Sequence, residues 1–169
     1  YLLMHTDLGA GLQREEIRRI SMAAIMHDVG KIAISDGILN KPGKLTAEEF
    51  DIMKTHTVQG ARLLEKIPQL RKHAVFHYAY DIARHHHERW NGKGYPDGLS
   101  GDAIPVWVQV VSVADVYDAL VSKRVYKDAY GFDEALEMIS GGQCGQFSPC
   151  LMEAFTGAEK ELRRLYHTK

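Results

Sequence analysis

The chain has 169 residues, of which 45% are hydrophobic, and this suits one domain with a substantial core. Its 21 Lys and Arg residues against 22 Asp and Glu give a formal net charge of -1, which argues against a nucleic-acid polymer or an anionic membrane surface as partner. No apolar run approaches the roughly 18 to 20 residues of a membrane span.

The first predicted helix covers residues 14–29, where apolar residues recur at helical spacing. Gly30 is expected to end this helix, which places the adjacent pair His27 and Asp28 at its C-terminal end. The pair offers an imidazole and a carboxylate, two groups that bind divalent metals.

A second helix is predicted from Thr46 to about Lys66. Thr46 and Glu49 form a capping box at its start, and Pro68 stops it. This helix contains His56, a second imidazole that could bind a metal.

The next helical stretch covers residues 69–87 and is expected to be interrupted or lengthened around residues 74–80. It delivers His86 and His87 at its C-terminal end. The segment that follows, residues 91–105, is rich in glycine and proline and therefore predicts an ordered loop.

Three more helices are predicted, over residues 105–122, 131–140 and 148–166. Pro105 suits the first turn of the first one, which carries Asp115, and Ser148 caps the last one. The valines of residues 106–113 also fit a strand, but polar residues at three-residue steps favour a helix. The chain is therefore predicted to be all-α, a helical bundle of about 6–7 helices.

Six residues form a potential ligand set for two divalent metals: His27, Asp28, His56, His86, His87 and Asp115. A lone histidine is usually an ordinary surface or core residue, and this interpretation is kept for His5, His73, His77, His85 and His167. A carboxylate can bridge two metals about 3.5 to 4 Å apart, and Asp28 is the candidate bridge.

Four motifs follow one another along the chain: HDVGKI at 27–32, KPGKLTAEEFDIMKTH at 41–56, HHERWNGKGYPDGL at 86–99 and VADVYDALVSKRVYK at 113–127. Together they resemble the HD-GYP domain, a bacterial branch of the HD phosphohydrolase superfamily that acts on cyclic di-GMP. The resemblance implies an HD-type helical bundle over residues 1–169, with a Gly/Pro-rich GYP loop.

The resemblance also implies how the ligands divide between two metals. One metal is held by His27, Asp28 and Asp115, and the other by Asp28, His56, His86 and His87. It favours iron or manganese, while nickel and zinc also fit nitrogen and oxygen ligands without thiolate.

The mechanism implied by the resemblance is in-line attack of a metal-activated hydroxide on a phosphodiester phosphorus. Asp28 and Lys31 are the residues expected to act in catalysis. Lys31 would contact the phosphate and help to protonate or stabilise the leaving ribose 3′-oxygen, although it also fits a solvated lysine. The expected product is pGpG, with further hydrolysis to GMP left open.

Substrate contacts are implied for Lys31, Tyr95, Arg124 and Lys127. Arg124 and Lys127 match a basic pair that grips phosphate, or form a solvated basic patch. Val125 stands where the family usually has proline, so weaker positioning is expected. Tyr95 lies in the GYP loop, which is implied to help recruit diguanylate cyclase (GGDEF) domains.

The resemblance fails in one place. Family members have a Glu and a His one helical turn apart upstream of the HD pair, at a position that falls before Tyr1. His5 is not a substitute for them. The first helix is therefore expected to be missing or truncated, and a third metal is expected only if those upstream ligands exist.

Several residues and properties keep two interpretations. Glu88, Arg89 and Asp118 fit either structural roles or support of the metal ligands. The two cysteines are expected to be reduced thiols of a cytoplasmic bacterial protein, with a sensory or receiver domain upstream and a homodimer left open. The alternative functions are hydrolysis of another nucleotide, or a catalytically weak module that binds cyclic dinucleotide or a diguanylate cyclase.

Overall fold

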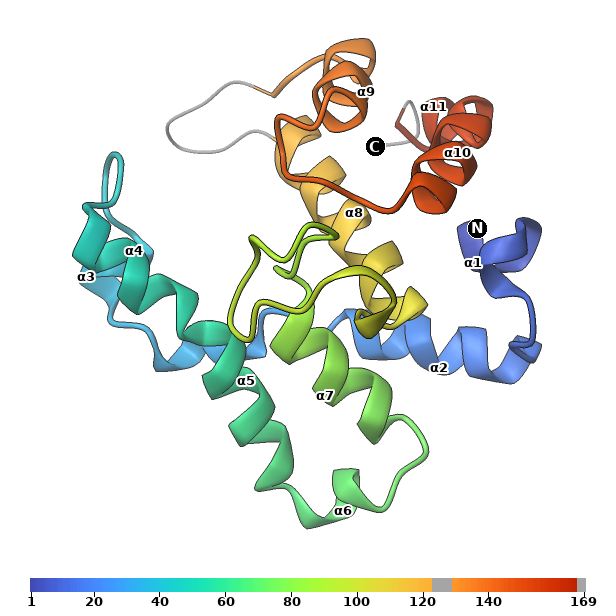
Figure 1. The fold of residues 1–169 in the computed structure, drawn as a ribbon. Coiled ribbons are helices and arrows are strands. Elements are labelled where there is room, and N and C mark those ends of the chain that lie inside the picture. Colours follow the sequence, from blue (N-terminus) through green and yellow to red (C-terminus); the bar gives the residue numbers. More distant parts are fainter. Residues whose placement is uncertain (123–128, 167–169) are drawn as a thin grey trace.

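A computed structural model shows a helical chain and describes residues 1–122 and 129–166 (Figure 1). In these residues the only β-type pairing is an isolated bridge between Asn91 and Ser100. The prediction of an all-α fold is confirmed. Across the same two ranges, no helix is both long and apolar enough to cross a membrane.

The α-helices are α1 (Leu2–His5), α2 (Arg14–Ala24), α3 (Asp36–Leu39), α4 (Ala47–Lys54), α5 (His56–Glu65), α6 (Pro68–Arg71), α7 (Phe76–His85), α8 (Val106–Val121), α9 (Phe132–Ser140), α10 (Pro149–Gly157) and α11 (Glu159–Tyr166). Three 3-10 helices join them: η1 (Asp7–Gly9), η2 (Val29–Ala33) and η3 (Gly101–Ala103). The described ranges thus hold more helices than the 6–7 predicted, because several predicted helices are divided and because the short helices α1 and α3 lie outside the predicted ranges.

The first predicted helix ends earlier than the periodicity indicated. After Ala24 the backbone tightens, with hydrogen bonds from the His27 N–H to the Ala24 carbonyl and from the Val29 N–H to the Met26 carbonyl. Bonds over three residues are the pattern of a 3-10 helix. The His27-Asp28 pair therefore lies in a tight turn between α2 and η2, and the prediction that it ends a helix is wrong by one turn.

The second predicted helix is divided at Thr55, where α4 ends and α5 begins with His56. Its capping box is confirmed, because the Thr46 hydroxyl accepts the Glu49 N–H at 3.2 Å and the Glu49 carboxylate accepts the Thr46 N–H at 2.7 Å. The break sets His56 at the start of a new helix.

The later helices follow the predictions with smaller changes. The expected interruption of residues 69–87 falls between α6 and α7, and residues 106–113 are helical. The Ser148 cap is confirmed by a bond from the Leu151 N–H at 3.2 Å. The last predicted helix is divided at Ala158 into α10 and α11.

Helix α8 joins two hydrophobic clusters of the core. Val108 and Val111 pack in a cluster built mainly from α2 and α7, whereas Val113 and Leu120 pack with α9 and α10. In Figure 1, α8 runs from the α2 and α7 layer toward α9 and α10. Asp115 is therefore carried on the helix that connects the two parts of the core.

Candidate metal centre

A glycine contact brings the HD pair beside His56. A Cβ added at Gly30 of η2 would lie 1.9 Å from the His56 carbonyl oxygen and 2.4 Å from the Gly60 nitrogen of α5. Only glycine permits this approach of two backbones. The crossing joins segments that are separate in the sequence, and it places Asp28 next to the start of α5.

Three of the predicted ligands form a group, which we call the histidine cluster: the buried His56 and His86 and the half-buried His87. One ring nitrogen from each lies within 4.8 Å of the others. His56 and His86 are only 1% and 0% exposed. Three imidazoles at this spacing are a suitable ligand set for one divalent metal.

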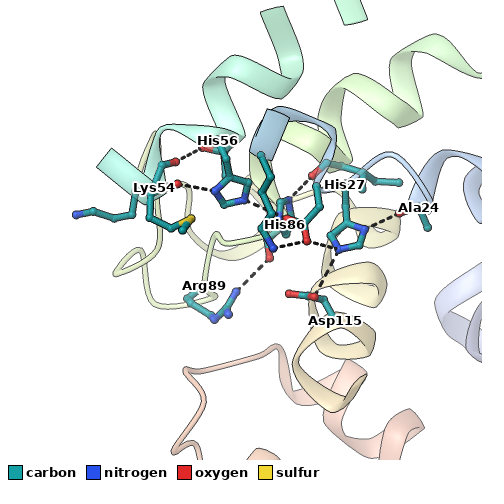
Figure 2. A network of polar contacts seen from close by, with 12 residues as sticks. Ala24, His27, Lys54, His56, His86, Arg89 and Asp115 are labelled. Atoms are coloured by element: carbon teal, nitrogen blue, oxygen red, sulfur yellow. Dashed lines mark hydrogen bonds and ion pairs between the residues drawn. The ribbon is translucent and has the colours of Figure 1, made fainter. Parts of the chain in front are cut away.

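The other predicted ligands form the carboxylate cluster: His27, Asp28 and Asp115. The His27 Nε2 lies 3.2 Å from Asp28 Oδ2 and 3.5 Å from Asp115 Oδ1. Figure 2 shows His27 and Asp115 facing one another, with His86 and His56 on the other side of the network. Each of the six side chains predicted from the sequence therefore belongs to one of two adjacent clusters.

Three of the histidine rings are held in the same way, by a backbone carbonyl at Nδ1. The Nδ1 atoms of His27, His56 and His86 lie 2.8, 2.7 and 2.9 Å from the carbonyl oxygens of Ala24, Met53 and Ile82. A carbonyl only accepts, so Nδ1 carries the proton in these bonds. When such a ring is neutral, its lone pair is on Nε2, which faces the clusters, as in histidines that bind metals. His27 takes this form only after it gives up its second proton.

Asp28 connects the carboxylate cluster, to which it belongs, with the histidine cluster. One of its oxygens faces His27 and the other faces the histidine cluster. Its Oδ1 is 3.4 Å from His56 Nε2 and 3.8 Å from His86 Nε2. Its Oδ2 is 3.2 Å from His27 Nε2 and 2.5 Å from Lys31 Nζ. This is the arrangement expected of a carboxylate that bridges two metals.

Buried atoms without hydrogen bonds support a cation at this position. Among the described residues, Asp28 Oδ1, His56 Nε2 and His86 Nε2 are buried and have no hydrogen-bond partner. Buried polar atoms are normally paired. Lone pairs that converge without a donor fit a metal ion, so the residues present suit the predicted cofactor.

The two clusters differ in charge. Hydrogen bonds with Asp115 and Asp28 raise the pKa of His27 to about 10. Burial lowers the pKa of His86 to about 4 and also lowers the pKa of His56 and His87. Burial alone would raise the pKa of Asp28, but His27 and Lys31 hold it far below its usual value.

Two cavities flank these ligands. A cavity of about 560 Å³ with a mainly apolar wall lies against α1, α2 and α8, and it reaches His27, Asp28, Asp115 and Asp118. A second cavity of about 280 Å³ lies on the other side and includes Lys31, His87, Arg89 and Cys144. The second one joins ligands of both clusters to two cationic side chains.

The substrate residues predicted from the sequence are only partly described. Lys31 lies beside Asp28, and the Tyr95 ring stacks on His87 with centroids 4.8 Å apart. Arg124 and Lys127 lie outside the described residues. His5, His73, His77 and His85 do not belong to the histidine cluster, and His167 is not described.

Arg89 supports the turn that carries His86 and His87. Its Nη1 donates to the His86 carbonyl at 3.2 Å (Figure 2). It also donates to the Glu88 carbonyl at 2.8 Å and to the Ser112 hydroxyl at 2.8 Å. The turn is thereby tied to α8, three residues before Asp115. The sequence left the role of Arg89 open. It did not indicate that Ser112 is its partner, because the two residues come from distant segments.

The fold and the site define a helical domain in which histidine and aspartate side chains converge as a group that could hold divalent metals. Residues 6–147 match a family model described as HD domain. The match covers most of the chain, so the chain belongs to the HD-domain family.

Several relatives are similar over most of this chain. The cyclic di-GMP phosphodiesterase response regulator RpfG of Xanthomonas campestris is 44% identical over 92% of the chain, and a cyclic di-GMP phosphodiesterase of Thermotoga maritima is 43% identical over 92%. A 3'3'-cGAMP-specific phosphodiesterase 2 of Vibrio cholerae is 42% identical over 85%. The chain covers 40%, 41% and 27% of these three relatives, respectively.

Proposed function

We propose that this chain is the HD-GYP catalytic domain of a metal-dependent phosphodiesterase that hydrolyses cyclic di-GMP to pGpG, with further hydrolysis to GMP left open. The observation that carries the proposal is Asp28, whose two oxygens face two different groups of ligands. The names of the relatives from Xanthomonas and Thermotoga support this substrate.

The proposed cofactors are two divalent ions, with iron or manganese favoured by the family resemblance and nickel or zinc also compatible with the ligands. His27, Asp28 and Asp115 would hold one ion, and Asp28 with the histidine cluster the other. When bound, such a pair supplies activated water and neutralises charge on the phosphate. A third ion is proposed only if an upstream Glu and His exist.

The side chains around the second cavity would receive the phosphodiester. Lys31 has its ammonium group at Asp28 and lines that cavity, which supports a role in binding phosphate and stabilising the leaving oxygen. Tyr95 would form part of the wall beside His87. Arg124 and Lys127 are proposed to add charge at the phosphate, as the family resemblance suggests.

The remaining proposals concern the setting of the domain. The relatives are longer than this chain, which supports a sensory or receiver domain upstream of residues 1–169. We propose a bacterial cytoplasmic location, docking of diguanylate cyclase (GGDEF) domains at the GYP loop, and a homodimer as one assembly to test.

A second candidate substrate is 3'3'-cGAMP, because one relative is specific for it by name. Both molecules contain two phosphodiesters between purine nucleosides, so the metal clusters alone do not select between them. Selection would come from the cavity walls that meet the bases. A non-catalytic binding module is the remaining alternative.

The test is turnover by protein loaded separately with manganese and with ferrous iron under anaerobic conditions. Equal concentrations of cyclic di-GMP and 3'3'-cGAMP compete in one reaction, and chromatography follows both substrates and products. We expect pGpG to appear first and metal-stripped protein to be inactive. Tight binding of cyclic di-GMP without turnover under either metal would contradict the proposal, and preferential loss of 3'3'-cGAMP would favour the second candidate.

A further inference from the structure

His87 is held differently from the other histidines of the site. His27, His56 and His86 each have a backbone carbonyl at Nδ1, whereas no hydrogen bond of the His87 ring occurs among the described residues. Instead, the ring of Tyr95 stacks on it with an interplanar angle of 27°. The two residues also meet at the backbone, where the Tyr95 N–H donates to the His87 carbonyl at 3.3 Å.

Tyr95 belongs to a loop that Glu88 fastens at its far end. The Glu88 side chain is buried, and its Oε1 accepts the backbone N–H of Asp97 at 2.7 Å and of Gly98 at 3.1 Å. At the near end, a Cβ on Gly94 would lie 2.4 Å from the Glu88 Cα. The loop thus lies directly against the residue that follows His87.

Asp97 adds a second attachment, this time to the end of α7. Arg84 donates to both oxygens of Asp97, at 2.7 and 2.8 Å, and His85 Nε2 lies 2.9 Å from Oδ2. A bidentate guanidinium contact fixes direction as well as distance. Residues 94–98 are therefore bound to residues 84–88, which form the segment that carries His86 and His87.

The Tyr95 ring also meets Phe50 of α4. The two ring centroids are 6.4 Å apart and the planes are nearly perpendicular, at 84°. Tyr95 is thus stacked with the His87 imidazole and also meets a second aromatic ring at nearly a right angle. Such contacts hold aromatic rings in preferred orientations.

We propose that Tyr95 is a positioning residue for His87, and that its stacked ring does for this imidazole what the backbone carbonyls do for the other three. The GYP loop is then a support for one metal ligand, in addition to any contact with substrate. The proposal deepens the function proposed above, since it rests on His87 as a metal ligand. Loss of ligand support of this kind usually weakens metal binding about 10- to 100-fold.

The experiment compares Tyr95→Phe, which keeps the aromatic ring, with Tyr95→Leu, which loses the ring but keeps an apolar side chain. Tyr80→Leu is the matched control, because Tyr80 contacts Phe76 on α7 and belongs to neither cluster. Manganese retained per chain is measured by mass spectrometry against increasing chelator. We expect one of two bound equivalents to weaken about 10- to 100-fold in Tyr95→Leu. Tyr95→Phe and the control should match the wild type.

A second measurement needs no metal. In metal-free protein labelled at histidine, the ring current of residue 95 should shift the imidazole signals of His87, and this shift should persist in Tyr95→Phe and disappear in Tyr95→Leu. Circular dichroism checks that every variant remains helical.

Unchanged metal retention in Tyr95→Leu would overturn the proposal, and so would equal losses in the Phe and Leu variants, since the hydroxyl would then be responsible. If the wild type turns over cyclic di-GMP but the leucine variant keeps both metals, only the positioning role fails. If the wild type holds no metal, the proposed function fails and the positioning role fails with it.

Discussion

The histidine cluster and the carboxylate cluster contain similar ligands but are held in place by different forces. His56 and His86 are almost fully buried and neutral, because burial lowers their pKa. In the carboxylate cluster, by contrast, side chains are 24 to 30% exposed, and His27 lies between two carboxylates that raise its pKa. Packing orients the first group, whereas opposite charges hold the second together.

The difference matters because Asp28 takes part in both arrangements. One of its oxygens faces neutral, buried imidazole nitrogens, and the other faces the cations of His27 and Lys31. A change at Asp28 should therefore affect both clusters. A change at another ligand should affect mainly its own cluster.

Asp28→Ala should have the largest effect. It removes the proposed bridge, so we expect both metals to be lost and kcat/KM for cyclic di-GMP to fall by more than about 100-fold, beyond the loss from a supporting residue. Metal content and turnover are measured together. Asp102→Ala, at an exposed aspartate of η3, should leave both unchanged. Retention of one full metal equivalent by Asp28→Ala would show that Asp28 serves a single cluster.

Alanine variants of His56 and His27 should distinguish the contributions of the two clusters to metal binding and to stability. Each is expected to lose one metal equivalent, but His56→Ala should also destabilise the metal-free protein by about 1–3 kcal/mol, because it removes a side chain that is only 1% exposed together with its bond to the Met53 carbonyl. His27→Ala should cost less, since its side chain is 26% exposed. Urea unfolding of the metal-free variants measures this order. A larger loss for His27→Ala would mean that the charged cluster contributes more to the fold.

The sequence identified the candidate ligands from their residue types, and the structure brings these side chains together. His27, Asp28, His56 and Asp115 are all brought to the site, although they come from separate segments. The turn after Ala24 was missed, since an apolar pattern at near-helical spacing does not distinguish an α-helix from the 3-10 turns that follow. The division at Thr55 likewise has no glycine or proline to mark it.

The supporting contacts could not be predicted, because they join segments far apart in the chain. The motif containing Gly30 was recognised, but the packing of Gly30 on the backbone of α5 depends on tertiary structure. The same holds for Arg89 with Ser112 and for Tyr95 with Phe50. The candidate ligands can thus be recognised from short stretches of the sequence. Their positions relative to one another depend on contacts across the whole fold.

Gly30→Ala tests that placement without changing any ligand. The added Cβ would overlap the His56 carbonyl, so η2 and α5 must separate, and we expect a loss of about 1–3 kcal/mol in the free energy of unfolding. Metal binding should weaken in both clusters, because Asp28 moves away from His56. Gly37→Ala is the matched control, as a Cβ there meets nothing within 4 Å. Equal stability of the two variants in urea would contradict the role proposed for the close contact between Gly30 and α5.

The smallest effect is expected from Asp97→Asn in the loop that supports His87. The pKa of Asp97 is lowered, mainly by its hydrogen bonds with Arg84, so its stabilising effect is complete above the ordinary value of 3.8 and is lost as the pH falls through the lower folded value. The partly exposed pair should contribute at most about 1 kcal/mol at neutral pH. The difference from wild type in urea should therefore shrink in acid.

Asp51→Asn, which removes an exposed ion pair with Lys54, is the control for loss of a surface charge. Its effect should be smaller than that of Asp97→Asn at neutral pH, because its side chain is 70% exposed. If Asp97→Asn instead cost more than Gly30→Ala, packing would not be the main force that orients the histidine cluster. The loop would then determine its geometry, and the contrast between a packed cluster and a charged one would have to be abandoned.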